Sequence, residues 1–369
     1  MHRILTARRH ELARASPMST YRTIVPLMRA SSRAYARATV AAMEAMRPGF
    51  VAKALPATFA SPESDIEVRV LQLAESLAVD APELFADSVA WYRTALHFRG
   101  VADDYLSLSL DALATVLERE LPPSHGSGFL RSLAMAQQAA RSVPAVPPSP
   151  IEQQGPFARR AQQFLLAVLE GQGEEAMDVV RTALLEGVTP AQVHDSILMP
   201  AQQEVGRMWM LGEAPIADEH FASQLAGQVL SLLQSRVPKP APDAPHVVAF
   251  AVSGNLHDLG IRIITQRLQF AGFRVTNLGA DLPASDLPWA LSGRQCDLLA
   301  VSATMLLHLG QARSVVDVRN TQLGGSPPIL LGGSPFAKVP DLHVRLGAEA
   351  GAGDADSAVQ CALRLTKRA

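Results

Sequence analysis

One strand–loop–helix segment constrains the fold of this 369-residue chain more than any other feature. Residues 246–253 (HVVAFAVS) form an apolar, β-branched run of strand length, and residues 261–271 have the apolar spacing of a helix. Residues 272–275 then begin another strand. This alternation predicts a parallel sheet, and such sheets bind ligands at the carboxyl ends of their strands. The connecting loop places the imidazole of His257 at that edge, and Gly260 leaves room for a large group to approach.

Residues 255–260 (Asn-Leu-His-Asp-Leu-Gly) resemble the Asp-x-His-x-x-Gly signature of cobalamin-binding domains, whose histidine is the lower axial ligand of cobalt. Four later segments, 278–283, 301–304, 330–333 and 347–355, match further landmarks of that family in the same order. The resemblance covers residues 246–369 and implies a doubly wound, flavodoxin-like parallel sheet of about five strands. It also implies a set of residues around the cofactor, with His257 on the metal: Asn255, His257, Asp258, Gly260, Ser302, Thr304, Gly332 and Gly333.

The first position of this signature departs from the family pattern, because it is Asn255 and not aspartate. A carboxylate bonded to the far nitrogen of a ligating imidazole raises the basicity of that ligand. We expect Asn255 to accept the same N–H through its amide oxygen, but without a charge. His257 should therefore bind cobalt somewhat more weakly, and Asn255→Asp should tighten the bond. We expect the side chain of Asp258 to cap the following helix.

Residues 157–235, directly before this domain, predict four helices. Thr189-Pro190 is typical of a helix start, with a capping side chain followed by proline at the first helical position. Residues 198–200 (Leu-Met-Pro) predict a junction between two helices, and the last helix is expected from Asp218 to about Ser235. A four-helix segment at this position resembles the cap that shields the upper face of cobalamin.

Within this cap, Trp209 is followed after nine residues by Glu219 and His220. This spacing resembles the Trp-x9-Glu-His pattern of CarH-type adenosylcobalamin photoreceptors. The resemblance implies that Trp209 packs against the adenosyl group and that Glu219 hydrogen-bonds it. It further implies that His220 binds cobalt after light has broken the carbon–cobalt bond. A simpler interpretation makes Trp209 a core residue and Glu219 a carboxylate that complements the helix dipole.

Residues 1–142 predict an almost wholly helical domain, with neither wing strands nor the basic recognition helix that CarH-type relatives carry in this part. The expected helices are Thr23–Met46, Ser64–Val79, Pro82–Phe98, Asp103–Leu121 and Gly128–Arg141. The domain resembles the globin-like partner domain of photocobilins, which are cobalamin photoreceptors that also hold a bilin. That resemblance implies a biliverdin pocket, without a thioether bond, at Trp91, Tyr92, His97 and Arg99. The alternative is an interaction domain in which these aromatic residues are core.

The amino-acid composition argues against two classes of binding partner, nucleic acids and membranes. The 33 basic and 35 acidic residues leave no electrostatic footprint for nucleic acid, and no apolar run reaches the length of a membrane span. Two cysteines suggest a reducing compartment, and we expect a cytoplasmic protein. Pro-rich linkers at 143–150 and 237–245 divide the chain into three expected domains, 1–142, 157–235 and 246–369.

These features together predict a light-responsive cobalamin sensor that is not an enzyme. Photolysis of adenosylcobalamin would change the cap, and the output would pass to a downstream signalling protein or through a homo-oligomer. The alternative is a corrinoid protein that carries methyl groups for a methyltransferase. Such a carrier must open its upper face to a partner, which a tryptophan and a Glu-His pair would obstruct. A third alternative, motivated by Asn255, is a scaffold that has lost its cofactor.

Overall fold

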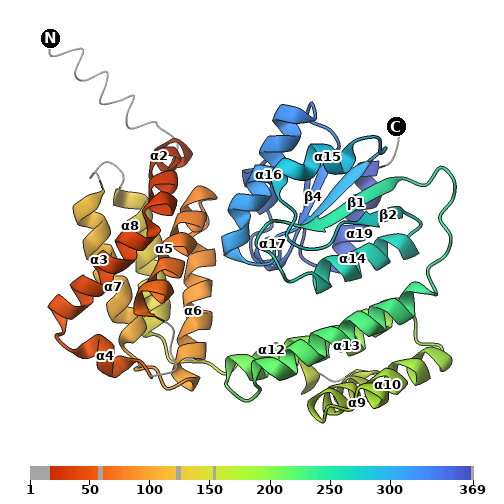
Figure 1. The fold of residues 1–369 in the computed structure, drawn as a ribbon, viewed down its shortest axis with the longest axis horizontal. Coiled ribbons are helices and arrows are strands. Elements are labelled where there is room, and N and C mark those ends of the chain that lie inside the picture. The colour runs from red at the N-terminus through yellow and green to blue at the C-terminus, as the bar shows by residue number, and fades with distance from the viewer. Residues whose placement is uncertain (1–16, 57–60, 122–125, 153–154, 367–369) are drawn as a thin grey trace. The chain divides into compact units, whose positions relative to one another are not determined.

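The structure is a computed structural model, and it describes residues 17–56, 61–121, 126–152 and 155–366. The chain forms two compact units, Met1–Pro144 and Ala145–Ala369 (Figure 1). No helix among the described residues combines the length and apolar character needed to cross a membrane.

The first unit is built from helices alone among its described residues. They are α2 (Pro17–Ala30), α3 (Ser32–Met46), α4 (Phe50–Ala54), α5 (Pro62–Ala78), α6 (Pro82–Phe98), α7 (Tyr105–Glu120) and α8 (Gly126–Arg141). The prediction of one helix over Thr23–Met46 was wrong, because the chain turns at Ser31, where φ is −110° and ψ is 14°. Serine competes with the helix for backbone hydrogen bonds, and two serines are adjacent at this point.

The cap in the second unit contains α9 (Ala158–Leu169), α10 (Gly173–Leu185), a long segment from Pro190 to Met210, and α13 (Ile216–Gln234). The predicted start at Thr189 is confirmed, because its hydroxyl accepts the backbone N–H of Gln192 in a capping box. The expected junction at residues 198–200 coincides with a change of helix type, without an interruption of the helical backbone. The chain runs from α11 (Pro190–Val193) through a π-helical turn (His194–Leu198) into α12 (Met199–Met210). This wider turn directly precedes Pro200, whose ring cannot fit a regular α-turn.

The predicted doubly wound sheet is confirmed. Its five parallel strands are β1 (His246–Ala251), β2 (Arg274–Asn277), β3 (Leu298–Ser302), β4 (Ile329–Gly332) and β5 (Ala350–Ala352). Their order is β2-β1-β3-β4-β5, so the chain reverses its direction of winding between β1 and β3. Loops diverge at such a reversal and leave a crevice at the carboxyl ends of the two strands. The segment with His257 follows β1 directly and therefore lies at this crevice.

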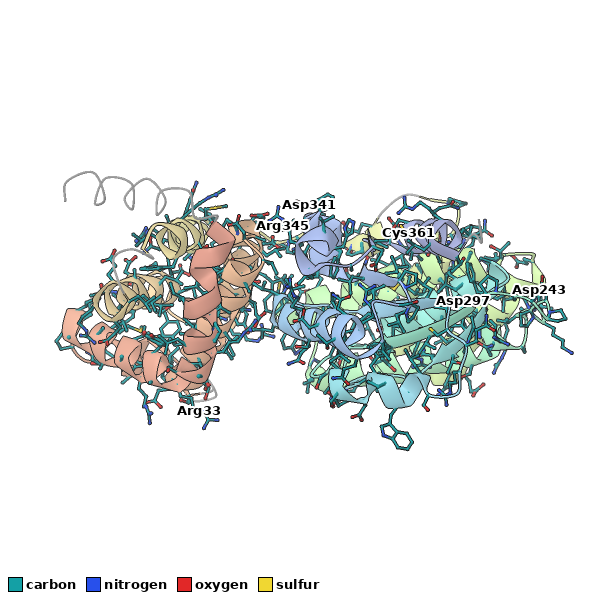
Figure 2. All side chains as sticks on the ribbon, turned by 90° about the horizontal axis from the view of Figure 1, so that it is seen from above. Arg33, Asp243, Asp297, Asp341, Arg345 and Cys361 are labelled. Atoms are coloured by element: carbon teal, nitrogen blue, oxygen red, sulfur yellow. The ribbon has the colours of Figure 1, made fainter. Side chains whose placement is uncertain are left out.

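Helices cover both faces of the sheet. On one face α14 (Leu259–Phe270) and α19 (Ala355–Thr366) pack their apolar residues against alternate residues of the strands. Figure 1 shows α16 (Leu309–Gln322) on the opposite face, near the short helix α15 (Leu287–Leu291). Two further short helices, α17 (Ser334–Lys338) and α18 (Leu342–Leu346), precede β5. Both cysteines are free and partly buried, and one of them is Cys361 on α19 (Figure 2).

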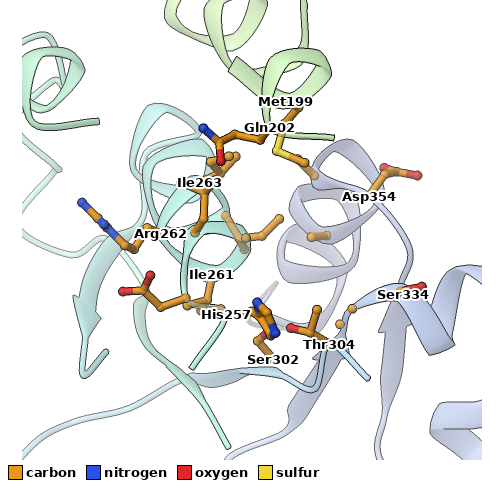
Figure 3. Close-up of a pocket in the computed structure, with 18 of the residues that line it drawn as sticks. Met199, Gln202, His257, Ile261, Arg262, Ile263, Ser302, Thr304, Ser334 and Asp354 are labelled. Carbon is orange, nitrogen blue, oxygen red and sulfur yellow. The ribbon is translucent and has the colours of Figure 1, made fainter. Parts of the chain in front are cut away.

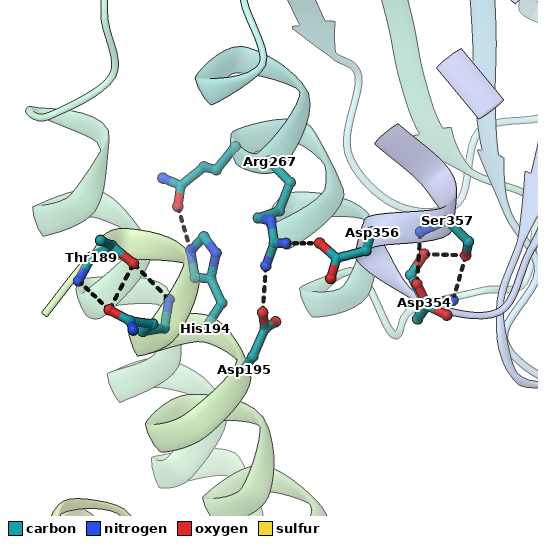
Figure 4. A network of polar contacts seen from close by, with 9 residues as sticks. Thr189, His194, Asp195, Arg267, Asp354, Asp356 and Ser357 are labelled. Atoms are coloured by element: carbon teal, nitrogen blue, oxygen red, sulfur yellow. Dashed lines mark hydrogen bonds and ion pairs between the residues drawn. The ribbon is translucent and has the colours of Figure 1, made fainter. Parts of the chain in front are cut away.

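Helix α14 also holds the cap. Its Ile263 joins the apolar core of the cap helices, so part of that core comes from the sheet domain. Gln266 accepts a hydrogen bond from Nε2 of the buried His194 at 3.0 Å and donates to the carbonyl of Leu230 at 2.6 Å. Arg267 pairs with Asp195 of the cap at 2.6 Å and with Asp356 of α19 (Figure 4). This junction is therefore polar as well as apolar, and α14 is its common element.

We predict that this junction makes the stability of the protein depend on pH. Burial lowers the pKa of His194, so the unfolded chain takes up a proton at a pH where the folded ring stays neutral. The stability contributed by His194 is present above about pH 6.5 and is lost as the pH falls below that value. We expect the free energy of unfolding, measured by urea titration of the full chain, to decrease below this pH in the wild type. The decrease should be shallower in His194→Gln, and equal slopes would contradict the prediction.

Candidate functional site

A cavity of about 890 Å³ lies at the carboxyl edge of the sheet (Figure 3). One wall is the β1–α14 loop with the start of α14, and the second is formed by the ends of β3, β4 and β5. The third wall comes from α12 and α13 of the cap. The cavity is thus closed only when cap and sheet domain are both present, and it coincides with the crevice that the strand order produces.

His257 lines this cavity with an exposed side chain, and Asn255 lies buried behind it. The amide nitrogen of Asn255 donates to the carbonyl of Ser302 at 3.2 Å and to the hydroxyl of Thr304 at 3.1 Å. Its amide oxygen accepts the backbone N–H of His257 at 3.2 Å. The expected bond from this oxygen to the imidazole is replaced by one to the backbone two residues on, a local geometry that asparagine favours. Asn255 therefore fixes the loop, and the loop presents His257.

The same loop is attached to the segment that follows β2. The backbone N–H of Gly254 donates to Asp281, which follows β2, at 2.6 Å. On the other side lies His308, at the end of the turn η5 (Leu306–His308) that follows β3. Its ring is buried, and its Nδ1 accepts the backbone N–H of Met305 at 3.1 Å. Burial lowers the pKa of His308, and the nearby His257 lowers it further.

His308 was not found from the sequence. It has no spacing or motif that relates it to the loop fifty residues earlier, and only the parallel arrangement of β1 and β3 brings the two together. The prediction for Asp258 was also wrong in part. Asp258 is the N-cap residue of α14, but its side chain makes no capping hydrogen bond and instead lines the cavity.

Glycines shape the floor of the cavity. At Gly333, where φ is +127°, a Cβ atom would lie 2.3 Å from the carbonyl oxygen of Ala303, so only glycine allows this close approach of the β3 and β4 ends. At Gly260 a Cβ atom would meet nothing within 4 Å. Because Gly260 lines the cavity, a side chain there would project into space that a ligand needs. An exposed imidazole above a floor of small residues fits a broad, flat ligand that brings its own metal.

The cap contributes Glu219 and His220, which lie in the first turn of α13 and line the same cavity as His257. A carboxylate oxygen of Glu219 lies 2.7 Å from Nδ1 of His220, and the other accepts the hydroxyl of Ser223 at 2.8 Å. Ser223 was not identified from the sequence, although its spacing of four residues from Glu219 on a helix places both on one face. Trp209, partly buried near the end of α12, is not among the described residues that line the cavity.

In the first unit, the four residues expected at a bilin pocket lie in the second half of α6 and at its C-cap, Arg99. Trp91 contacts Tyr92 edge-on, with ring centroids 5.2 Å apart. His97 lies 2.8 Å from a carboxylate oxygen of Asp103, and Arg99 donates to the carbonyl of Ala95 at 3.2 Å. The structure therefore groups Trp91 with Tyr92 and gives His97 and Arg99 partners of their own. Their role in binding a tetrapyrrole stays a prediction.

Comparisons with known proteins agree with this geometry. A family model described as B12 binding domain matches residues 245–362, and a second with the same description matches residues 160–234. Dimethylamine corrinoid protein 3 of Methanosarcina acetivorans is 26% identical over 201 residues, which cover 54% of this chain and 93% of that protein. The HTH-type transcriptional repressor CarH of Myxococcus xanthus is 26% identical over 208 residues, 54% of this chain and 67% of the repressor.

A solved structure, the Methanosarcina barkeri monomethylamine corrinoid protein, is also similar, with a TM-score of 0.50 and 22% identity. The match covers 57% of this chain and 99% of that one, and at this identity it supports the fold alone. The two family matches confirm the prediction that the chain binds cobalamin. The two relatives are named as a corrinoid protein and a repressor, in agreement with the expectation of a protein that is not an enzyme. They give no support to the expectation that nucleic acid is not a partner, since one of them is a transcriptional repressor.

We predict that Asn255→Asp destabilises the loop before any cofactor is bound. A carboxylate cannot donate to Ser302 or Thr304, and it would place an oxygen against the carbonyl oxygen of Ser302. We expect the free energy of unfolding of the cofactor-free chain to fall by about 1–3 kcal/mol, measured by urea titration. Asn277→Asp is the matched control, because the amide oxygen of Asn277 accepts the N–H of Gly279 and a carboxylate preserves that bond. A loss no larger in Asn255→Asp than in the control would refute the prediction.

Proposed function

We propose that this chain, which belongs to the cobalamin-binding family through residues 160–234 and 245–362, is a light-responsive cobalamin sensor and not an enzyme. The observation that carries the proposal is that Glu219 and His220 of the cap line the same cavity as His257 of the sheet domain. A ligand in this cavity therefore has a histidine on the sheet side and a carboxylate–histidine pair on the cap side.

His257 is the proposed lower ligand, with an exposed imidazole on a loop that Asn255 holds in place. Adenosylcobalamin, when bound, supplies a cobalt–carbon bond that visible light cleaves. Glu219 would accept hydrogen bonds from the adenosyl group, because Ser223 and His220 already orient its carboxylate. With Nδ1 of His220 facing Glu219, its second ring nitrogen would be the one to hold the metal from the cap side. The proposed cofactor site also includes Asp258, Gly260, Ser302, Thr304, Gly332 and Gly333, all of which line the cavity.

The switch in this proposal is the cap. A ligand can shift an equilibrium between two arrangements only by interacting differently with each of them. Loss of a group held by Glu219 removes contacts on the cap side alone, since Glu219 belongs to α13. What then holds the cap to the sheet domain is the junction on α14, with Gln266 and Arg267. We propose that the change at this junction is the output, passed to a downstream protein or to a second copy of the chain.

A corrinoid protein that carries methyl groups is the second candidate, and one observation favours it. Trp209, which was expected to cover the upper ligand, is not among the described residues that line the cavity. The cap side of the cavity is then less closed than the Trp-x9-Glu-His pattern implies. A methyl carrier requires such an opening, because a partner enzyme must reach the upper face of its cofactor. The relatives include a dimethylamine corrinoid protein and the repressor CarH at equal identity. Against this candidate stands the Glu219–His220 pair, whose polar groups offer nothing to a methyl group.

The first experiment is the absorption spectrum of the full chain loaded with adenosylcobalamin, recorded in the dark and after green light. We expect a light-dependent change in the wild type. In Glu219→Ala, affinity for adenosylcobalamin should fall about 10- to 100-fold relative to methylcobalamin, since a charged hydrogen-bond acceptor contributes about 1.5–3 kcal/mol. Glu174→Ala serves as the matched control, because Glu174 is an exposed glutamate on α10 of the cap and is not among the described residues that line the cavity. Equal affinity of the wild type for both cobalamins would instead support the methyl-carrier function.

His257→Ala tests the lower ligand. The variant should convert bound cobalamin to a form without a histidine nitrogen on cobalt and should retain the cofactor more weakly, because the metal loses its proposed protein ligand on the sheet side. The measurement is the absorption spectrum after gel filtration, compared with the wild type. A spectrum unchanged by the substitution would exclude His257 as the ligand.

Biliverdin is the proposed second chromophore of the first unit, with Trp91, Tyr92, His97 and Arg99 as its neighbours. The support for it is the aromatic pair on α6 together with nearby cationic groups, which suit the rings and propionates of a linear tetrapyrrole. The full chain incubated with biliverdin should show a bound far-red absorbance band that Trp91→Ala weakens. A colourless protein after removal of free pigment would leave cobalamin as the only chromophore and make this unit an interaction domain.

A further inference from the structure

We infer that Asp281 is a positioning residue for the cobalamin site, because its carboxylate holds the loop from which His257 projects. The inference rests on the proposed role of His257 as the cobalt ligand. Asp281 follows β2 and is not among the described residues that line the cavity, so it acts through the backbone of another segment.

The carboxylate of Asp281 accepts two hydrogen bonds from the loop that follows β1. One of its oxygens accepts the backbone N–H of Gly254 at 2.6 Å, and the same oxygen accepts the hydroxyl of Ser253 at 3.2 Å. Hydrogen bonds to a carboxylate are stronger than those between neutral groups. Asp281 therefore ties two successive residues of this loop to the segment after β2.

The backbone of Asp281 is itself held against β1. The carbonyl of Gly279 accepts the N–H of Ala251 at 2.9 Å, and the N–H of Leu282 donates to the carbonyl of Ala251 at 3.0 Å. Between these two bonds the φ of Asp281 is +57°, in the left-handed region that is uncommon for residues other than glycine. Such a conformation persists only where the surrounding contacts impose it. The carboxylate thus projects from a backbone that β1 holds in one conformation.

Two side chains from different segments hold the loop ahead of His257. Asp281 holds Gly254 from the side of β2, and the φ of Gly254, +77°, also lies in the left-handed region. The next residue, Asn255, is buried, is anchored to the end of β3, and accepts the N–H of His257 through its amide oxygen. Because each side chain fixes only one side of this turn, we expect removal of Asp281 to loosen the backbone at His257.

Two substitutions at Asp281 distinguish positioning from simple support of a turn. Asp281→Gly removes the carboxylate but suits the backbone, because glycine adopts a positive φ without strain. Asp281→Asn is the conservative rescue, since asparagine tolerates this backbone region and its amide oxygen can accept the N–H of Gly254. Asp80→Gly is the matched control, because Asp80 is also an aspartate at positive φ, +51°, but lies in the first unit.

The first measurement is amide hydrogen exchange of the cofactor-free full chain. Gly254 loses its own acceptor in Asp281→Gly, so its amide should exchange faster whatever the role of the carboxylate. The informative amides are those of Asn255, His257 and Asp258, whose hydrogen-bond acceptors lie within the same stretch of chain and not on Asp281. We expect these amides to exchange about tenfold faster in Asp281→Gly, because one hydrogen bond to a charged group is lost, and at the wild-type rate in the other two variants.

The second measurement uses the full chain loaded with cob(II)alamin, in which electron paramagnetic resonance reports the fraction of cobalt with an axial histidine nitrogen. We expect Asp281→Gly to lower this fraction and to weaken cobalamin affinity about tenfold, at the lower end of the range seen when outer hydrogen-bond partners of a metal site are lost. Asp281→Asn should recover most of both losses, and Asp80→Gly should match the wild type.

The contrary results separate this inference from the proposed function. If the wild type carries no histidine nitrogen on cobalt and His257→Ala changes nothing, the proposed role of His257 is overturned and this inference with it. If the wild type carries the histidine, but Asp281→Gly retains it and speeds exchange at Gly254 alone, Asp281 supports only the turn and this inference alone is overturned. An equal loss in Asp80→Gly would also overturn it, because the effect would then not be specific to the loop.

Discussion

The hydrogen bonds of the buried Asn255 amide are the interaction on which the rest of the site depends. This one side chain joins the loop after β1 to the end of β3 and, through its oxygen, sets the backbone direction at His257. The amide is fully buried, so an alternative loop shape would leave donors and acceptors unpaired, at about 1–3 kcal/mol each. The cavity wall, the exposed imidazole and the adjacent hydroxyl of Thr304 all follow from this constraint.

Helix α14 connects that loop to the cap. The loop with His257 leads directly into it, and further along it carries Ile263, Gln266 and Arg267, which contact the cap. Arg267 is nearly buried between two carboxylates of greater exposure, so its charge is paired on both sides. A rigid helix with the proposed metal ligand at one end and the cap along its length relates events at the cavity to the position of the cap. No separate transmitting segment is required.

The spacing of apolar residues and the residues typical of turns and helix caps predicted those elements that depend on neighbouring residues in the sequence. The β1–loop–α14 segment, the parallel sheet and the cap start at Thr189 all depend on residues close together in the chain. A prediction failed where another local interaction outweighed the helical preference on which it was based. The helix expected through Ser31 is broken, because adjacent serines compete for its backbone hydrogen bonds. Asp258 lines the cavity, and its carboxylate makes no capping hydrogen bond to α14.

The sequence by itself determined that this chain contains a cobalamin-binding sheet with His257 at its edge and a helical cap before it. Those conclusions follow from an ordered set of short motifs, each readable within about ten residues. Only the tertiary structure decided what surrounds that histidine: that Asn255 bonds the backbone and not the imidazole, that His257 is close enough to His308 to lower its pKa, and that Trp209 is absent from the described lining. The physical reason is that parallel strand pairing joins residues some fifty positions apart, and no local pattern records which side chains then meet.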